Sequence, residues 1–221
     1  LVVPCYNEAA RLDVAAFRRF AAEHPQRLIF VNDGSTDATH DVLAKLHESD
    51  PRRFLLFDLP RNQGKAEAVR QGVLRAFEEG CDYVGYWDAD LATPLAVIPQ
   101  LHDFLETRPD IQIVVGARVR LLGRRIERRA LRHYLGRVFA TAASLTLGLA
   151  IYDTQCGAKL LRAGEETRRL FEEPFRTNWI FDVEMLARFV RGRRASGGEP
   201  AESAIYEWPL DEWRDVAGSK V

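Results

Sequence analysis

Two acidic residues one residue apart, Asp88 and Asp90, follow directly after the apolar run 83–87. Carboxylates repel one another, so two of them at the end of a buried strand indicate that they hold something there. Alternate residues of an extended chain point to opposite sides, so both carboxylates converge only if the chain turns, which the small Ala89 permits. Two hard oxygen donors with open positions suit Mg²⁺ or Mn²⁺ bridging a diphosphate. The alternative is that both acids only form a turn or cap a helix.

Two further polar clusters stand at the ends of predicted strands, namely 4–8 (PCYNE) and 32–37 (NDGSTD). Ligands in open α/β sheets bind outside the carboxyl ends of the strands, so the three clusters outline one crevice. Asp33 at its edge could accept a hydrogen bond from a base N–H, whereas an ordinary turn through Gly34 is the alternative. The glycines form neither G-x-G-x-x-G nor a P-loop, which disfavours a dinucleotide dehydrogenase or an ATPase.

Strand and helix patterns alternate through the first half of the chain. Five apolar runs predict strands: 1–4, 27–33, 53–59, 82–88 and 111–117. Helical patterns lie between them: 8–23, 37–48, 65–79 and 95–107. Ser35 or Thr36 is expected to cap the second helix, and Pro94 suits the start of the fourth. The alternation predicts an α/β sandwich around a mainly parallel sheet.

Beyond residue 117 this alternation stops. We expect an amphipathic helix, a short segment at 151–163, a helix near 182–192, a surface loop at 194–203 and a strand at 204–208. One face of the amphipathic helix is apolar and carries Leu131, Leu135, Val138, Ala142 and Leu145.

Composition limits the function classes. With 221 residues, 47% of them hydrophobic, the chain suffices for one core with peripheral additions, so we predict one domain over 1–221. A net charge of −1 argues against a nucleic-acid partner. Three cysteines without a CxxC pair indicate a reduced, cytosol-facing protein. No run of 18 apolar residues is present, so the chain does not span a membrane by itself.

The charge is unevenly distributed. Residues 116–137 contain eight arginines and the single acid Glu127, a local charge of +7, so the rest must carry −8 to give −1. Such a run is often a solvated face. Beside an apolar helical face it also describes a helix that lies on anionic lipid.

Taken together, the motifs resemble those of the family-two inverting glycosyltransferases of the GT-A fold. The matching stretches, in chain order, are VVPCYNEAARL, VNDGSTDAT, NQGKAEAVRQG, DADLATP, VVGAR, DTQCGAKLLR and FDVEML. More narrowly, the chain is similar to the dolichyl-phosphate (polyprenyl-phosphate) β-glucosyltransferases. The DTQCG-x-K element and the closing W-x-x-x-x-GSK, from Trp213 to Lys220, favour that branch over the phosphomannose synthases. The resemblance extends from Leu1 to Lys220.

The resemblance implies roles on the donor side, in a nucleotide-sugar-binding half over 1–117. The nucleotide-sugar pocket would be lined by Pro4, Tyr6, Asn7, Glu8, Asp33, Gly64, Lys65, Asp88, Ala89 and Asp90. Within it, Asp33 would meet the uracil, Gly64 and Lys65 would lie near the base and ribose, and Asp88 and Asp90 would hold Mg²⁺ or Mn²⁺. Ala92 stands where phosphomannose synthases often have glutamine, which excludes a third side-chain ligand there.

The resemblance also implies an acceptor-binding half over 118–221. Arginines that would handle the acceptor phosphate are Arg118, Arg128, Arg129 and Arg132. Asp153 and Gln155 would meet the donor sugar or close a loop, and Cys156 is interpreted as packing. Asp182 would orient a sugar hydroxyl or cap a helix, with Glu184 a weaker candidate nearby. The expected catalytic set is Asp88, Asp90, Arg118, Arg132 and Asp182.

The predicted reaction is glucose transfer from UDP-glucose to a polyprenyl phosphate with inversion, assisted by the metal. We expect it at the cytoplasmic face of a membrane, with the chain peripheral or anchored by segments outside it. One alternative is a GDP-mannose or UDP-N-acetylhexosamine transferase acting on the same lipid or on a glycan. Others are a silent nucleotide-sugar-binding module and a nucleotidyltransferase, which would release pyrophosphate.

Overall fold

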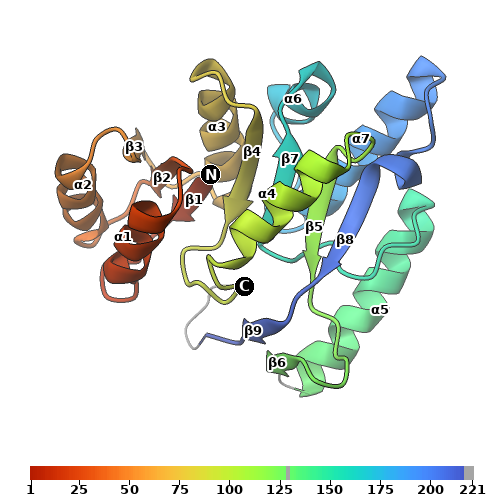
Figure 1. The fold of residues 1–221 in the computed structure, drawn as a ribbon, viewed down its shortest axis with the longest axis horizontal. Coiled ribbons are helices and arrows are strands. Elements are labelled where there is room, and N and C mark those ends of the chain that lie inside the picture. Colours follow the sequence, from red (N-terminus) through yellow and green to blue (C-terminus); the bar gives the residue numbers. More distant parts are fainter. Residues whose placement is uncertain (128–129, 217–221) are drawn as a thin grey trace.

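A computed structural model describes the backbone of residues 1–127 and 130–216, with the side chains of all of these except 130–135 and 137. Its centre is a seven-stranded sheet in the order β3-β2-β1-β4-β7-β5-β8 (Figure 1). The strand bounds are β1 Val2–Cys5, β2 Leu28–Asp33, β3 Phe54–Leu59, β4 Tyr83–Trp87, β5 Ile113–Ala117, β7 Ala158–Arg162 and β8 Ile205–Pro209. Only β7 runs antiparallel to its neighbours, so the predicted mainly parallel α/β sheet is confirmed.

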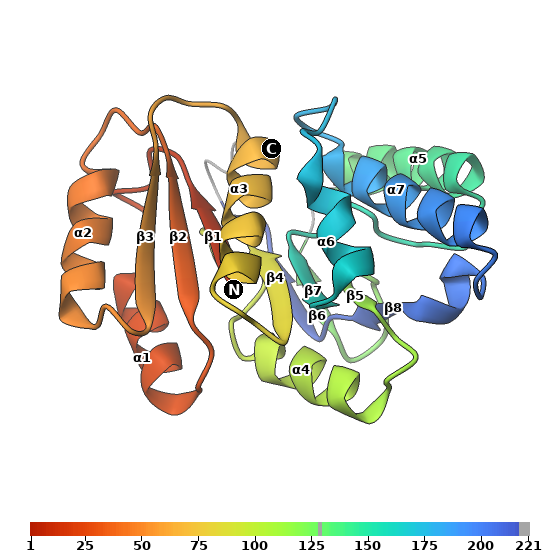
Figure 2. The same cartoon turned by 90° about the horizontal axis from the view of Figure 1, so that it is seen from above.

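Helices cover both faces of this sheet (Figure 2). Their bounds are α1 Val14–Glu23, α2 Thr39–Ser49, α3 Lys65–Glu78, α4 Val97–Thr107, α5 Ala130–Leu147, α6 Glu165–Glu172 and α7 Phe181–Ser196. One core cluster joins the sheet to α1, α2 and α4, and the other joins it to α3, α6 and α7. Because both faces are covered, β2 is buried along its whole length and reads as a continuous apolar run up to its polar end.

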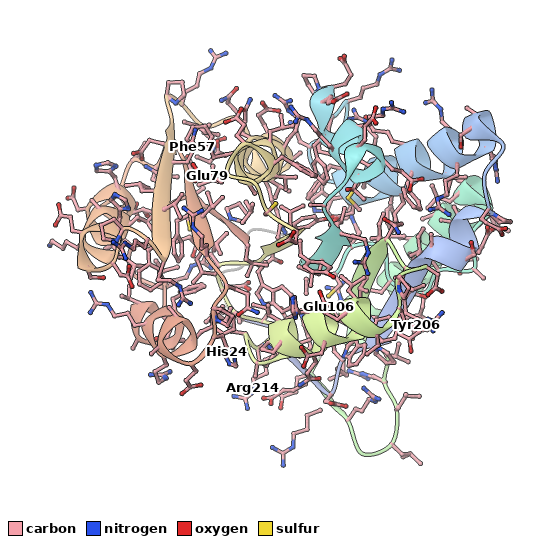
Figure 3. The ribbon with its side chains drawn as sticks, turned by 45° about the horizontal axis from the view of Figure 1, so that its top comes forward. His24, Phe57, Glu79, Glu106, Tyr206 and Arg214 are labelled. Carbon is pink, nitrogen blue, oxygen red and sulfur yellow. The ribbon has the colours of Figure 1, made fainter. Side chains whose placement is uncertain are left out.

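The sheet contains strands from both predicted halves. Residues up to 117 supply β1 to β5, and later residues supply β7 and β8. Tyr206 of β8 and Glu106 of α4 lie on the α4 face (Figure 3). The Tyr206 ring packs against Phe104 in a tilted arrangement with ring centroids 4.3 Å apart, and Tyr83 donates to Glu106 at 2.5 Å. The assignment of separate donor and acceptor roles to the two ranges stays a prediction.

Helix starts differ from those predicted. The first helix begins at Val14 rather than at residue 8, because the Asp13 side chain caps it by accepting from Ala16 N at 2.9 Å. The preceding residues are thereby free to form a loop. The expected cap of α2 is wrong, since its N-cap is Ala38 and makes no side-chain cap bond. Ser35 instead accepts a hydrogen bond from Asn7 N at 3.0 Å.

The 151–163 segment contains a strand that the sequence pattern did not indicate. Lys159 interrupts its apolar run, yet β7 pairs antiparallel with both β4 and β5. A second, two-stranded parallel sheet joins β6 (Arg125–Glu127) to β9 (Glu212–Arg214). Arg214 N donates to Ala92 O at 3.1 Å, so β9 lies against the loop that follows the acidic pair. Arg214 and His24 line one cavity beside α1 (Figure 3).

Gly34 permits a close approach between two loops at the carboxyl edge of the sheet. Its φ is +60°, and an added Cβ would lie 2.3 Å from the carbonyl carbon of Arg61. The turn after β2 therefore runs against the loop that leads into α3. Any side chain at this position would both strain the backbone and push the loops apart.

We expect Gly34→Ala to lower the free energy of unfolding by about 3 kcal/mol or more, because left-handed strain adds to a backbone clash. Gly80→Ala is the matched control, since Gly80 has φ +71° but open space around it. That change should cost only about 1–2 kcal/mol of strain. Urea unfolding measures both values, and equal losses would show that the loops do not need the close approach.

Candidate active site

A cavity of about 290 Å³ opens at the carboxyl ends of β1, β2 and β4. It is lined by Pro4, Cys5, Tyr6, Glu8, Arg11, Asp33, Asn62, Gly64, Lys65, Ala68, Asp88, Ala89 and Asp90. The structure therefore brings together every residue predicted for the nucleotide-sugar pocket except Asn7. Arg11, which forms an ion pair with Glu8, and Asn62 are lining residues that sequence reasoning missed.

Asn7 holds the loops beside the cavity. Its backbone has φ +54°, an uncommon value for a residue other than glycine. Its side-chain oxygen accepts from Thr36 N at 2.8 Å, and its own N donates to Ser35 Oγ. Asn7 thus connects the loop after β1 to the loop after β2.

Asp33 is 2% exposed at the end of β2, and its carboxylate accepts three hydrogen bonds. The donors are Gln63 N at 2.7 Å, Gly64 N at 2.9 Å and Asn62 Nδ2 at 3.1 Å. Burial raises the pKa of this carboxyl, and the backbone bonds from Gln63 and Gly64 oppose that rise. Asp33 fixes the loop into α3, and its expected contact with a base stays a prediction.

The carboxylate of Asp88 lies between a positive charge and a glycine. Its Oδ1 is 2.5 Å from Lys65 Nζ, the first residue of α3. A Cβ on Gly157 would lie 1.8 Å from Oδ2, so only glycine fits beside the carboxylate. Burial lowers the pKa of Lys65, but the carboxylates of Asp88, Asp182 and Asp90 outweigh it and the net shift is upward. Lys65 therefore stays charged.

The chain turns after Asp88, as it must if the carboxylates of Asp88 and Asp90 are to point into one cavity. Leu91 N donates to Asp88 O at 3.2 Å, and Leu91 has φ +53°. Asp90 Oδ1 accepts from Ala92 N at 3.0 Å. Both carboxylates consequently line the same cavity.

The two carboxylates of Asp88 and Asp90 fit a divalent cation that also needs oxygen atoms from a bound ligand. Asp88 already has a cation, the Lys65 ammonium, at one of its oxygens. Among the side chains that the structure describes, no three from His, Cys, Asp or Glu gather as a metal site. Two carboxylates leave several positions of Mg²⁺ or Mn²⁺ for diphosphate oxygens and water.

Asp182 is 5% exposed and belongs to a buried charged cluster. Its Oδ1 is 2.5 Å from Lys159 Nζ, and it also accepts from the Tyr86 hydroxyl. Lys159 in turn donates to Cys156 O at 2.7 Å. The N-cap of α7 is Ile180, so the helix-capping interpretation of Asp182 is wrong. Lys159 was missed, although a lysine within the apolar run AKLL is a signal for a buried, paired charge.

Arg118 and Asp153, predicted for different roles, form one ion pair. The guanidinium donates to the carboxylate at 2.6 and 2.8 Å, and Arg118 N donates at 3.1 Å. Burial alone would lower the pKa of Arg118, but Asp153 reverses this and raises it. The guanidinium also lies 5.2 Å from the ring centre of Trp213. Glu207, another missed residue, accepts from Asp153 N at 2.8 Å.

The structure does not describe the side chains of the other predicted acceptor arginines. Arg128 and Arg129 fall outside the described residues, and for Arg132 only the helical backbone is described. Their assignment to an acceptor phosphate stays a prediction.

The remaining candidates have structural contacts. Gln155 donates to Trp179 O at 3.4 Å. Glu184 accepts from Arg176 N at 2.9 Å and thereby holds the loop before α7. Cys156 is fully buried, and burial raises the pKa of its thiol to about 11, so its interpretation as packing is confirmed.

We expect Gly157→Ala to displace the Asp88 carboxylate and to weaken binding of the predicted ligands, UDP with Mn²⁺, by roughly 10- to 100-fold. Gly192→Ala is the control, because an added Cβ on this α7 glycine meets nothing within 4 Å. Calorimetric titration of both variants measures the affinity. Undiminished affinity in Gly157→Ala would contradict the fixed position of Asp88.

The sequence was compared with those of known proteins and families. A family model described as Glycosyl transferase family 2 matches residues 1–165. The chain is 33% identical to a dolichyl-phosphate beta-glucosyltransferase of Trichomonas vaginalis, with 100% of this chain and 65% of that protein covered. It is 28% identical to the Saccharomyces cerevisiae dolichyl-phosphate beta-glucosyltransferase, with 100% and 68% covered. The chain thus spans about two thirds of the length of these relatives.

Solved structures share the fold. Glucosyl-3-phosphoglycerate synthase from Mycobacterium tuberculosis, in complex with phosphoglyceric acid, has a TM-score of 0.67 at 21% identity, covering 97% of this chain and 71% of that one. A Pyrobaculum calidifontis mannosyltransferase in complex with GDP-Man and Mn²⁺ has a TM-score of 0.60 at 17% identity, covering 99% and 56%. The architecture is the GT-A fold, and with its family model matched over most of its length the chain belongs to glycosyl transferase family 2.

Proposed function

We propose that this chain transfers glucose from UDP-glucose to a polyprenyl phosphate, with inversion at the anomeric carbon. The observation that carries the proposal is the placement of Asp88 and Asp90 in one cavity with Asp33 and Lys65. Relatives that match the whole chain are named for glucosyl transfer to dolichyl phosphate. The mycobacterial synthase that shares the fold was also solved in complex with Mn²⁺ and UDP, which supports the choice of donor and metal.

The donor side of the cavity would act by electrostatics. A divalent cation held by Asp88 and Asp90 would supply positive charge to the diphosphate as it leaves. Lys65, which lies beside Asp88 in the cavity, would add a further positive charge for the diphosphate. The acceptor oxygen attacks the anomeric carbon, the bond from that carbon to UDP breaks, and UDP leaves with the bonding electrons. A single displacement of this kind inverts the configuration.

The contacts of Asp182 favour a phosphate over a hydroxyl as the group that accepts the sugar. A phosphate monoester has its second pKa near ~6, so at neutral pH it is mostly dianionic and needs no base. Asp182 is the carboxylate that an alcohol acceptor would require, but its Oδ1 already accepts from Lys159 and Tyr86. Arg132 would instead position the attacking anion, and Arg118 would add only the guanidinium donors that Asp153 leaves unused.

The basic segment, residues 116–137, supports a membrane surface as the place of reaction. We propose that the reaction takes place on the cytoplasmic face of that membrane. Leu121 and Leu122 are exposed in the loop before β6. On α5, Val138 and Leu145 of the predicted apolar face are 71% and 79% exposed rather than packed in the core. Exposed apolar residues beside arginines suit anionic lipid. Of the helices described, none has the length and apolarity needed to cross a bilayer.

A panel of UDP- and GDP-sugars with a short polyprenyl phosphate and Mn²⁺ tests the proposal. We expect transfer from UDP-glucose, loss of transfer in excess chelator, and a decrease of turnover in Asp90→Asn by about 10²-fold or more because the diphosphate loses its cation. Preference for GDP-mannose would favour the second candidate, which the fold shared with the GDP-Man-bound mannosyltransferase keeps open. Donor binding without transfer would indicate a silent module, and pyrophosphate release a nucleotidyltransferase.

Binding to vesicles tests the membrane surface. We expect Arg120→Ser with Arg125→Ser to weaken binding to vesicles that contain anionic lipid, because two charges leave the basic segment. Arg18→Ser with Arg19→Ser removes the same charge from α1 and should bind as the unchanged protein does. Binding should also fall near 1 M salt, where the Debye length is about 3 Å. Equal binding of the two double variants would show that the arginine run is only a solvated face.

A further inference from the structure

Lys65 occupies the position where a metal ion would meet Asp88. Its ammonium lies 2.5 Å from Asp88 Oδ1, while the other carboxylate oxygen, Oδ2, lies against Gly157, where an added Cβ would be 1.8 Å away. Coordination bonds to Mg²⁺ or Mn²⁺ are about 2 Å long, so a metal on Oδ1 and the ammonium would lie within a few Å of each other. Two such charges repel strongly, and Lys65 must move before the metal can bind.

Lys65 can move because its ion pair with Asp88 lies at the wall of the cavity and is partly exposed. Its side chain is 34% exposed, and that of Asp88 is 27% exposed. Lys159 behaves differently. Lys159 is fully enclosed and bonded to Asp182 and Cys156, so it stays in place. A ligand that brings negative charge into the cavity would offer Lys65 a new partner, and a diphosphate is such a ligand.

We propose that Lys65 is a resident cation that neutralises Asp88 in the empty site and transfers to the diphosphate when the metal and the nucleotide enter together. Lys65 therefore makes metal binding depend on the nucleotide. When free metal binds, the Lys65 ammonium loses its contact with Asp88 and gains no new partner. When the metal enters with the nucleotide, phosphate oxygens become the new partners of the ammonium. This inference rests on the metal site in the proposed function and assigns Lys65 a role beyond contact with the base and ribose.

Titration of free Mn²⁺ by electron paramagnetic resonance tests the inference without any measurement of activity. The proteins are the unchanged chain, Lys65→Met, Lys65→Arg and Lys45→Met, each with and without UDP. Lys45 is an exposed lysine on α2 and serves as the matched control. Without UDP, Lys65→Met should bind Mn²⁺ on the order of tenfold more tightly, because the competing charge is gone. Lys65→Arg and Lys45→Met should bind as weakly as the unchanged chain.

The ratio of the Mn²⁺ affinities with and without UDP gives the coupling. We expect this ratio to decrease in Lys65→Met and to stay unchanged in Lys45→Met. An unchanged affinity and ratio in Lys65→Met would overturn the inference, with Lys65→Gln as a second neutral variant if the first one does not fold. Asp88→Asn distinguishes a failure of the Lys65 inference from a failure of the proposed metal site. If this variant binds Mn²⁺ in the presence of UDP as the unchanged chain does, the assignment of Asp88 to the metal is wrong.

Discussion

Asp88 lies where β4, β7 and α3 meet, with its carboxylate between the Cα of Gly157 and the ammonium of Lys65. This contact depends on the antiparallel β7, which brings Gly157 to the end of β4, where Gly157 O accepts from Asp88 N at 3.0 Å. It also depends on the loop that sets the start of α3, which Asp33 holds through Gln63 N and Gly64 N. The position of one carboxylate is therefore determined by three segments distant in sequence.

Charges around this carboxylate are paired within the protein. Lys159 and Asp182 form a buried pair, and Arg118 and Asp153 form a second one. A buried charge that loses its partner is strongly destabilising, so these pairs hold their side chains in a single geometry. The Lys65–Asp88 pair is more exposed than either of them. Two buried pairs thus lie near a more exposed pair that a ligand can open.

The strands before residue 117 and the convergence of Asp88 and Asp90 could be predicted from the sequence, because apolar runs and the polar ends of parallel strands are local signals. β7 could not, since Lys159 interrupts its pattern and only a partner on α7, Asp182, explains a charge there. For the same reason Asp182 looked like a helix cap. The amphipathic pattern of α5 was visible, but which face the core covers depends on tertiary packing. Arg118 and Asp153 are 35 residues apart, so no spacing rule could pair them.

The place of β7 also sets an order of events during synthesis. β4 and β5 do not pair with each other, because the strand between them comes from residues 158–162. A nascent chain that has emerged only to residue 117 therefore exposes the unpaired edge of β4, and β5 lacks both neighbours. Unpaired edges of apolar strands promote aggregation, and pairings between distant segments form slowly. The sheet can close only after the later segment leaves the ribosome, which makes chaperone dependence and late, cooperative folding expected properties of this chain.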